Sequence, residues 1–381
     1  MRILHLFSDW KWTGPAEPAL DLVAAQREIG LDVTLACTPL PFEARDTIEA
    51  HARRRGIEIR TDLALRKHYH PWHNWRDRGR LRTILKREKF NVVHCHRLQD
   101  HWVAAAAMRG LPPTHRPILV RTCYDGVPQI PHWRNRRLYA GVTDWLIHAS
   151  EAACKEDARN FPLAGRASVI PAPLDTRRWR PDRTDLPDLR GSLGLSRDHV
   201  VFGIVARIQG KRRFDLLWEA FVRASREVPQ ARLVVIGRGT RQREVAEEPL
   251  RKMGLTDRVI LAGYRVEDYD AALATLDAKI YLVPGTDGTC RALRQAMAMG
   301  KPAIGTRRGM IPQIVTDGTD GILVDETPDA LAGAIARLAN DIDLRARMGI
   351  VAAAKARSEW DAMAVARKVA DGYSRRADGV K

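Results

Sequence analysis

The segment from residue 279 to residue 306 constrains the fold more than any other part of the chain. Strand-forming residues at 279–283 lead into a turn rich in glycine and threonine. A helix-forming segment then runs to Gly300, and Pro302 leads into another apolar run. Strand, loop, helix and strand in this order form the repeating unit of a parallel sheet covered by helices. The first N–H groups of such a helix are unpaired and lie at the positive end of its dipole, so this loop is predicted to bind an anion.

The same alternation of apolar strands and helical segments extends along the whole chain. Expected strands lie at 2–7, 32–36, 92–95, 118–121, 145–148 and 168–170, and a second series lies at 200–206, 232–236, 258–262, 278–283, 302–305 and 321–324. A chain of 381 residues also exceeds the ~100–200 residues typical of one domain. The sequence therefore predicts an α/β protein with two doubly wound, Rossmann-like domains. We place the first at 1–175 and the second at 199–355, joined by a linker at 176–198 that is rich in proline and arginine.

The composition indicates a protein without a membrane span. Hydrophobic residues make up 45% of the chain, which is enough for two cores. No segment reaches the ~18 uninterrupted apolar residues of a membrane span, and Met1 is followed directly by an expected strand rather than by a signal peptide. The five cysteines show no paired or metal-ligand spacing, so we expect reduced thiols, mostly in the core, and a cytoplasmic location.

The formal net charge of +17 predicts an anionic partner, which is a nucleic acid, a membrane or a substrate. Nine Lys and Arg residues and only two acidic residues lie between Arg66 and Lys89, with Tyr69, Trp72 and Trp75 among them. This mixture suits an anionic membrane surface, where each basic residue contributes on the order of 1 kcal/mol. A solvated helix with partly buried tryptophans would give the same pattern. No nucleic-acid-binding motif is present, so we expect a membrane contact through this segment and no nucleic acid.

Asp287, in the loop before the helix described first, and Gln295, in that helix, are eight residues apart. On a helix of ~3.6 residues per turn they fall within about 80° of each other, so both can reach one ligand. The pattern resembles the E-x7-E segment that binds the sugar nucleotide in the retaining family-four glycosyltransferases, which have the GT-B fold. Here Asp and Gln replace the usual glutamates. The resemblance implies that Asp287 holds the donor sugar, that Gln295 meets the ribose, and that Gly288, Thr289 and Cys290 offer backbone N–H groups.

Other loops in the second half resemble the rest of that family's donor site. Arg207 and Arg212 stand where the family has an Arg and a Lys that hold the donor diphosphate. An Arg at the second position keeps the charge and can bind phosphate oxygens in pairs. Gly237 follows the strand at 232–236 in a turn that the family places beside the nucleotide, and Val266 lies in its nucleobase-contacting segment. A solvated basic surface is the alternative for the arginine loop, and we interpret Lys211 as solvated.

Two segments of the first half are also similar to that family. His94 and His96 match an H-x-H pattern at a strand end. We interpret His94 as structural, whereas the resemblance implies that His96 contacts the donor sugar from the opposite domain. Gly14 matches the first glycine of a G-G-x-E loop, with Pro15 in place of the second glycine and Glu17 at the acidic position.

Asp268-Tyr269-Asp270 matches the DxD metal motif of the other large glycosyltransferase fold. It opens an expected helix from Glu267 to Leu276, where acidic side chains offset the helix dipole and cap free N–H groups. The GT-B resemblance implies that catalysis needs no metal, and we expect no cofactor besides the nucleotide-diphosphate sugar as co-substrate. It also implies that the final helix, at 356–381, packs back onto the first domain.

The sequence thus predicts a GT-B glycosyltransferase that transfers a sugar, with retention, from a nucleotide-diphosphate sugar to a glycan or lipid-linked acceptor in cell-surface polysaccharide synthesis. We expect it to be cytoplasmic and peripheral at the inner face of the membrane. The residues expected to be catalytic are His96, Asp287, Arg207 and Arg212.

Two alternatives stay open. One is a catalytically silent GT-B homologue that acts as a partner subunit. The departures at Gln295 and Pro15 motivate it, together with Ala172-Pro173, which stands where the family usually has Asn-Gly. The other is a nucleotide-sugar epimerase of the same architecture. The basic and aromatic segment argues for a transferase, because it indicates a membrane-bound acceptor.

Overall fold

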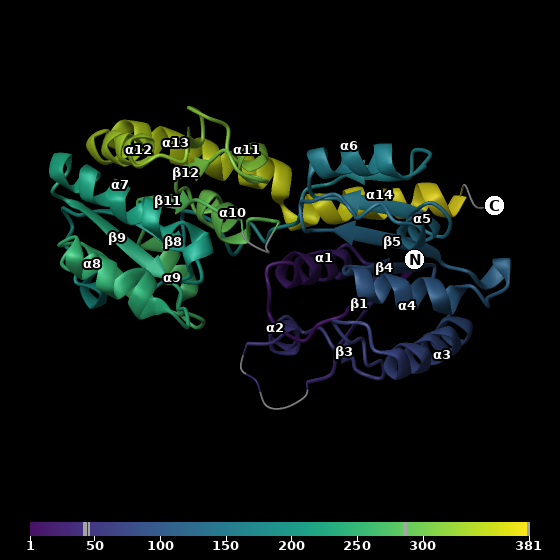
Figure 1. Cartoon of the computed structure of the whole chain (residues 1–381). Helices are drawn as coiled ribbons and strands as arrows, with labels where there is room; N and C mark the ends of the chain where they lie inside the picture. The colour runs from purple at the N-terminus through teal and green to yellow at the C-terminus, as the bar shows by residue number, and fades with distance from the viewer. Residues whose placement is uncertain (41–43, 45, 285–287, 379–381) are drawn as a thin grey trace. The chain divides into compact units, whose positions relative to one another are not determined.

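The computed structural model of the protein describes residues 1–40, 44, 46–284 and 288–378 (Figure 1). Its contacts divide these residues into two compact units. Unit 1 comprises 1–174, 288–289 and 359–378, and unit 2 comprises 175–284 and 290–358. Each unit is built on a parallel sheet, which confirms the prediction of two Rossmann-like α/β domains.

The sheet of unit 1 has the order β3-β2-β1-β4-β5-β6-β7. Its strands are β1 (Arg2–Phe7), β2 (Asp32–Cys37), β3 (Ile59–Arg60), β4 (Val92–Cys95), β5 (Ile118–Cys123), β6 (Trp145–His148) and β7 (Ala167–Val169). The chain order reverses between β1 and β4, where His5 is in register with His94. Ligands of such sheets bind at the carboxyl ends of the strands near this reversal.

Helices cover both faces of this sheet. They are α1 (Ala16–Glu28), α2 (Ile48–Arg54), α3 (Pro71–Glu88), α4 (Leu98–Met108), α5 (Trp133–Tyr139), α6 (Glu151–Asn160) and α14 (Ala362–Asp378). Apolar side chains of α3, α4 and α5 join one core, and those of α1 and α14 join another. Figure 1 shows α3 lying beside α4, which it contacts. The C-terminal helix therefore belongs to the core of unit 1, although it follows unit 2 in the sequence.

The sheet of unit 2 has the order β10-β9-β8-β11-β12-β13. Its strands are β8 (Val200–Val205), β9 (Ala231–Ile236), β10 (Val259–Gly263), β11 (Ala278–Tyr281), β12 (Ala303–Thr306) and β13 (Gly321–Val324). Its helices are α7 (Phe214–Glu227), α8 (Glu248–Lys252), α9 (Tyr269–Ala274), α10 (Arg291–Ala298), α11 (Ile311–Ile314), α12 (Pro328–Asn340) and α13 (Ile342–Lys355). No helix among the described residues of either unit is long and apolar enough to cross a membrane.

The strands lie within a few residues of their expected positions, but some elements were missed. The two-residue strand β3 is too short to show a periodic pattern. Helix α3 begins at Pro71, nine residues before the helix that the sequence pattern predicts at 80–87. His70 caps the true start by accepting a hydrogen bond from the N–H of His73, and a proline at the first helical position favours initiation. The aromatic residues of the basic segment therefore lie on and beside the first turns of this helix.

The amphipathic pattern of α14 explains why this helix joins unit 1. Val365, Val369 and Tyr373 recur every four residues and are at most 4% exposed, because this spacing places them on one face of a helix. Arg367 is exposed on the same helix. The apolar face packs against α1 and covers the sheet beside it.

Replacing Val369 with aspartate is therefore expected to destabilise unit 1 strongly. An unpaired carboxylate in this core should lower the free energy of unfolding by about 3 kcal/mol or more. The measurement is the unfolding transition of the purified variant by calorimetry. Arg367→Asp is the matched control, expected to change stability by no more than about 0.5 kcal/mol. Equal effects of the two substitutions would contradict the packing of α14.

Candidate functional site

Three loops of unit 2 pack backbone against backbone at the carboxyl ends of β8, β9 and β10. Gly237 has a φ of +149°, and a Cβ at this position would lie 2.0 Å from the carbonyl oxygen of Ala206. Its N–H donates to the carbonyl oxygen of Gly263 at 2.8 Å. Only glycine fits between these loops, so the predicted nucleotide-binding turn has a conformation that its neighbours fix.

The two predicted diphosphate-binding arginines differ in their surroundings. Arg207 is exposed in the loop after β8, as is Lys211. Arg212 is half-buried, and its Nη1 donates to the carbonyl oxygen of Val283 at 2.9 Å. Its Nε is buried and has no hydrogen-bond partner among the described residues. Val283 precedes the loop that leads to α10, so the structure brings Arg212 to this loop.

The helix that the sequence predicted after this loop is α10, of eight residues. Gly288, Thr289 and Cys290 precede it and are buried, and Cys290 has a left-handed φ of 49°. Asp287 lies outside the described residues. Gln295 is 1% exposed, and its Oε1 accepts a hydrogen bond from the Tyr269 hydroxyl at 2.9 Å. The apolar face of this helix is buried and consists of Ala292, Leu293, Ala296 and Met297.

The carboxylates of the DxD string already have cationic partners. Asp268 pairs with Arg265, and Asp270 lies 3.3 Å from Arg178 Nε. Asp268 precedes the shorter helix α9 without capping it by a side-chain hydrogen bond, so our prediction of a cap is wrong for this residue. Val266 is half-buried after β10, in the segment predicted near the nucleobase.

Three histidines gather at the carboxyl ends of β1 and β4 in unit 1. His5, His94 and His96 are at most 2% exposed, and His5 Nδ1 lies 2.8 Å from His96 Nε2. His94 hydrogen-bonds Thr122 and Tyr373, which agrees with the structural role inferred for it. The ring of His96 stacks on that of Tyr124, with 5.8 Å between ring centroids. The sequence pointed to His94 and His96 but gave no signal for His5, because only the strand register brings it beside them.

Metal ions are commonly held by three or more His, Cys, Asp or Glu side chains. Among the described residues, these three histidines form such a group, because their ligand atoms all lie within 4.8 Å of one another. All nitrogen atoms of His5 and His94, and Nε2 of His96, have hydrogen-bond partners within the protein. A metal would have to displace several of these bonds. The geometry therefore favours a hydrogen-bonded network.

Gly14 lies half-buried in the loop between β1 and α1. Pro15, which replaces the second glycine of the family pattern, is the residue that begins α1. Glu17 is buried in the first turn of that helix, where a carboxylate is favoured by the helix dipole.

A buried polar cluster that sequence reasoning missed lies beneath the carboxyl ends of β5 and β6. Arg121 is 3% exposed, and its Nε and Nη1 have no hydrogen-bond partner among the described residues. His148 Nε2 lies 3.4 Å from Asp157 Oδ2, and both side chains are fully buried. Burial lowers the pKa of His148 to about 4 and raises the pKa of Asp157 to about 7. A lone histidine in an apolar strand and a carboxylate on a helix gave no sequence signal for this pair.

A pocket of about 610 Å³ opens beside the carboxyl ends of β1 and β2. Basic and imidazole groups dominate its lining, which is formed by Asp9, Trp10, Lys11, Thr38, Arg66, Lys67, His68, Tyr69, His70 and His73. Lys67 Nζ pairs with Asp9 Oδ2 at 3.0 Å. The basic segment identified in the sequence thus forms one wall of a pocket at the ligand-binding edge of the sheet.

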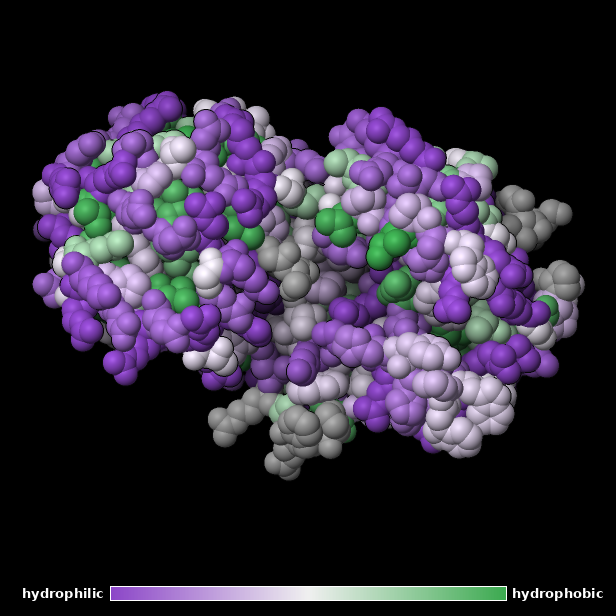
Figure 2. Space-filling view, viewed as in Figure 1, coloured by the Kyte–Doolittle hydropathy of each residue, from purple (hydrophilic) through white to green (hydrophobic). Residues whose placement is uncertain are grey.

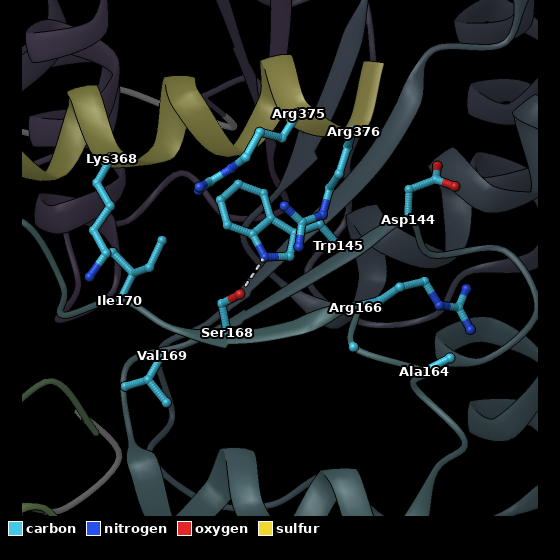
Figure 3. Close-up of a pocket in the computed structure, with 11 residues that line it drawn as sticks. Asp144, Trp145, Ala164, Arg166, Ser168, Val169, Ile170, Lys368, Arg375 and Arg376 are labelled. Carbon is cyan, nitrogen blue, oxygen red and sulfur yellow. Dashed lines mark hydrogen bonds between the residues drawn. The ribbon is translucent and has the colours of Figure 1, made fainter. Parts of the chain in front are cut away.

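A second pocket of unit 1, of about 530 Å³, lies where β6 begins and beside the edge strand β7 (Figure 3). Figure 3 shows Arg375 and Arg376 extending from α14 toward Trp145, and Lys368 extending toward Ile170. Trp145 Nε1 donates to Ser168 Oγ at 3.1 Å, and the Arg376 guanidinium lies 4.2 Å from the Trp145 ring centroid. Because Trp145 begins β6, this pocket reaches the amino end of that strand rather than the edge where parallel sheets bind ligands.

The buried pair predicts a pH dependence of stability. The pKa of Asp157 is raised above the ordinary value of 3.8 to about 7, so folding gains from this group below pH ~4 and loses that gain as the pH rises toward ~7. Asp157→Asn removes the effect. The variant's free energy of unfolding, relative to the parent's, should therefore increase with pH across this window, by up to ~1.4 kcal/mol per pH unit. Urea unfolding at several pH values measures it.

The control is Glu58→Gln, which removes an exposed carboxylate that precedes β3. Its difference from the parent should stay constant over the same pH range. A difference for Asp157→Asn that does not change with pH would contradict the raised pKa.

Comparison with protein families finds a matching family model for most of each unit. Residues 14–178 match the model of Glycosyltransferase Family 4, and residues 199–341 match that of Glycosyl transferases group 1. The chain is 26% identical over 305 residues to a phosphatidylinositol N-acetylglucosaminyltransferase subunit of Arabidopsis thaliana, covering 75% of this chain and 64% of that protein. It is 27% identical over 213 residues to the GDP-mannose-dependent alpha-(1-6)-phosphatidylinositol monomannoside mannosyltransferase of Mycolicibacterium smegmatis, covering 53% of this chain and 55% of that protein. The chain thus spans less than two thirds of the length of these relatives.

Solved structures share the fold over nearly the whole chain. The structure of Anabaena Alr3699/HepE in complex with UDP and glucose aligns with a TM-score of 0.75 and 19% identity, covering 98% of this chain and 99% of that chain. A glycosyltransferase from Rickettsia africae aligns with a TM-score of 0.81 and 13% identity, covering 98% of each chain. The chain therefore combines a segment that matches the Family 4 model with one that matches the group 1 model, and it shares the fold of these solved structures.

Proposed function

We propose that the protein transfers a sugar, with retention, from a nucleotide-diphosphate sugar to a lipid-linked or glycan acceptor in the synthesis of cell-surface polysaccharides. The observation that carries this proposal is Arg212, which reaches the loop before α10 through its bond to Val283 and keeps a buried Nε without a partner among the described residues. A guanidinium held beside a helix start is suited to binding phosphate oxygens. The relatives named above are sugar transferases, and HepE was solved with UDP and glucose.

On this proposal the donor binds in unit 2. Arg212 and Arg207 would hold the diphosphate, and the buried backbone of 288–290 would offer N–H groups at the start of α10. Gly237 and Val266 would border the nucleotide, with Gln295 near the ribose and Asp287 near the sugar. The arginines and the helix start would stabilise the departing diphosphate as charge that is already in place. Gly14 and His96 of unit 1 would contact the donor as well. We propose that no metal or other cofactor takes part.

We assign the acceptor to the pocket of about 610 Å³ in unit 1. Its basic and imidazole lining fits an acceptor that carries a phosphate, and Tyr69 and Trp10 offer flat apolar surfaces. Two relatives are named for phosphatidylinositol substrates, and a third, of Escherichia coli, for a diphosphoundecaprenol substrate. These names support a phosphate-bearing lipid as the acceptor class.

The segment 66–89 would hold this pocket against an anionic membrane at its cytoplasmic face. Trp72 and Trp75 are 62% and 60% exposed on the first turns of α3, and their rings stack at 5.5 Å. The alternative interpretation of this segment expected partly buried tryptophans, and that expectation is wrong. The face in Figure 2 is mainly hydrophilic with separate small hydrophobic spots, so attachment to lipid would depend on such aromatic and basic groups.

Nucleotide binding tests the donor assignment. A thermal-shift screen against UDP, GDP, ADP and their sugar conjugates should identify one base, because ligand at ~100 Kd stabilises the folded state by about 2.7 kcal/mol. Arg212→Ala should weaken the binding of that nucleotide by about 10- to 100-fold, because charge-assisted hydrogen bonds are lost. Lys211→Ala, at the exposed neighbour, serves as the control and should bind normally. Absence of any shift would favour the silent partner subunit.

Vesicle binding tests the membrane assignment. The double variant Trp72→Ser with Trp75→Ser should sediment several-fold less with phosphatidylserine-containing vesicles than the parent does, and added salt should weaken the parent's binding. Ile350→Ser is the control, since Ile350 is 69% exposed on α13 of unit 2. Binding that is equal on vesicles without anionic lipid, or unchanged in the double variant, would rule out this surface.

A further inference from the structure

The histidines at the carboxyl edge of unit 1 belong to a longer chain of buried hydrogen bonds, which we call the histidine relay. On one side, His96 Nε2 lies 2.8 Å from His5 Nδ1, and His5 Nε2 lies 2.8 Å from Gln26 Oε1. Gln26 Nε2 lies 3.3 Å from Tyr373 Oη, which links the two sides. On the other side, Tyr373 Oη lies 2.5 Å from His94 Nδ1, and His94 Nε2 lies 2.7 Å from Thr122 Oγ1. The members come from β1, α1, α14, β4, β5 and the residue after β4. The relay thus connects the C-terminal helix with His96.

Gln26 determines the direction of the bonds on the His5 side of the relay, because an amide oxygen only accepts and an amide nitrogen only donates. Its Oε1 faces His5, so His5 must donate from Nε2. A neutral imidazole has one donor and one acceptor, so Nδ1 of His5 accepts and His96 must donate from Nε2. The remaining nitrogen of His96, Nδ1, then carries a lone pair.

The other arm of the relay agrees with this direction. Gln26 Nε2 donates to the Tyr373 oxygen, and the hydroxyl proton of Tyr373 is left to donate to His94 Nδ1. His94 then donates from Nε2 to the Thr122 hydroxyl. Burial lowers the pKa of His5 to about 4 and the pKa of His94 and His96 well below the ordinary value, so the three rings are neutral near pH 7.

We propose that the relay fixes His96 as the tautomer protonated on Nε2, so that Nδ1 is a hydrogen-bond acceptor for a hydroxyl group of the substrate sugar. His96 Nδ1 is the one ring nitrogen of these three histidines without a partner among the described residues, and it is buried. A lone pair there attracts hydroxyl protons and repels phosphate oxygens. His5 and Gln26 are positioning residues in this scheme. The identity of the ligand as a sugar rests on the proposed function, whereas the tautomer does not.

The tautomer can be measured directly on the intact protein without substrate. Two-bond ¹⁵N–¹H correlation spectra of the protein labelled with ¹⁵N-histidine distinguish a protonated from an unprotonated ring nitrogen, and His96→Asn assigns the His96 signals by their loss. We expect an unprotonated Nδ1 and a protonated Nε2 at neutral pH. The opposite tautomer, or stoichiometric zinc in the purified protein, would overturn the proposal.

Two variants separate the arms of the relay. Gln26→Met removes the group that orients His5, so the His96 spectrum should change to a mixture of tautomers. Tyr373→Phe leaves the bond between Gln26 and His5 in place and should keep the parent tautomer. A His96 spectrum unaffected by Gln26→Met would contradict the relay. The parent spectrum decides the tautomer by itself if a variant fails to fold.

Ligand binding then tests the role of His96 separately from donor recognition. Thermal shifts are compared for UDP with UDP-glucose and for GDP with GDP-mannose. Gln26→Met should bind the nucleotide sugar several-fold more weakly than the parent and the nucleotide alone equally well. An equal loss for both ligands would contradict a sugar-specific role. If no nucleotide shifts the parent protein, the proposed function fails, while the tautomer measurement still stands.

Discussion

Both units depend on one constraint, which is that a parallel sheet must bury its two faces while every backbone group inside it is hydrogen-bonded. Helices on both faces satisfy the first requirement and strand pairing the second. Polar backbone is then left at the strand ends, and loops meet there. The fit of Gly237 against Ala206 follows from this, because loops after neighbouring parallel strands converge on one edge. The candidate sites of both units lie at such edges.

Within unit 1, the same constraint explains why polar side chains so deep in the fold are tolerated. His5, His94 and Gln26 are fully buried, and each has hydrogen-bond partners for its ring nitrogens or its amide. A buried polar group without a partner costs about 1–3 kcal/mol, so such a network is held in place by the cost of breaking it. Arg121 and His96 Nδ1 are among the buried groups of this unit that have no partner in the described part of the chain, and such exceptions are informative about function.

In unit 2, Gln295, which replaces one of the family's usual glutamates, fits the local structure. The amide oxygen of Gln295 accepts from Tyr269, and its amide nitrogen is a donor that a glutamate lacks. The charge of the region is carried by arginines. Arg212 is held in place by a backbone carbonyl, whereas Arg207 is exposed and has more freedom. A donor site of the proposed kind would recognise phosphate by preorganised charge.

The sequence alone determined the two α/β domains, most strand positions, the buried face of α10 and the arginine-bearing loop, because each is encoded by local periodicity or by a short motif. It did not reveal β3 or the first turns of α3, where two residues or a proline start give little periodic signal. It also gave no sign of His5, Gln26 and Tyr373 as one network. These residues are up to 368 positions apart in the sequence, and only strand register and the packing of α14 on α1 bring them together. Contacts of that kind depend on tertiary structure, because no local pattern records which distant side chains will share a core.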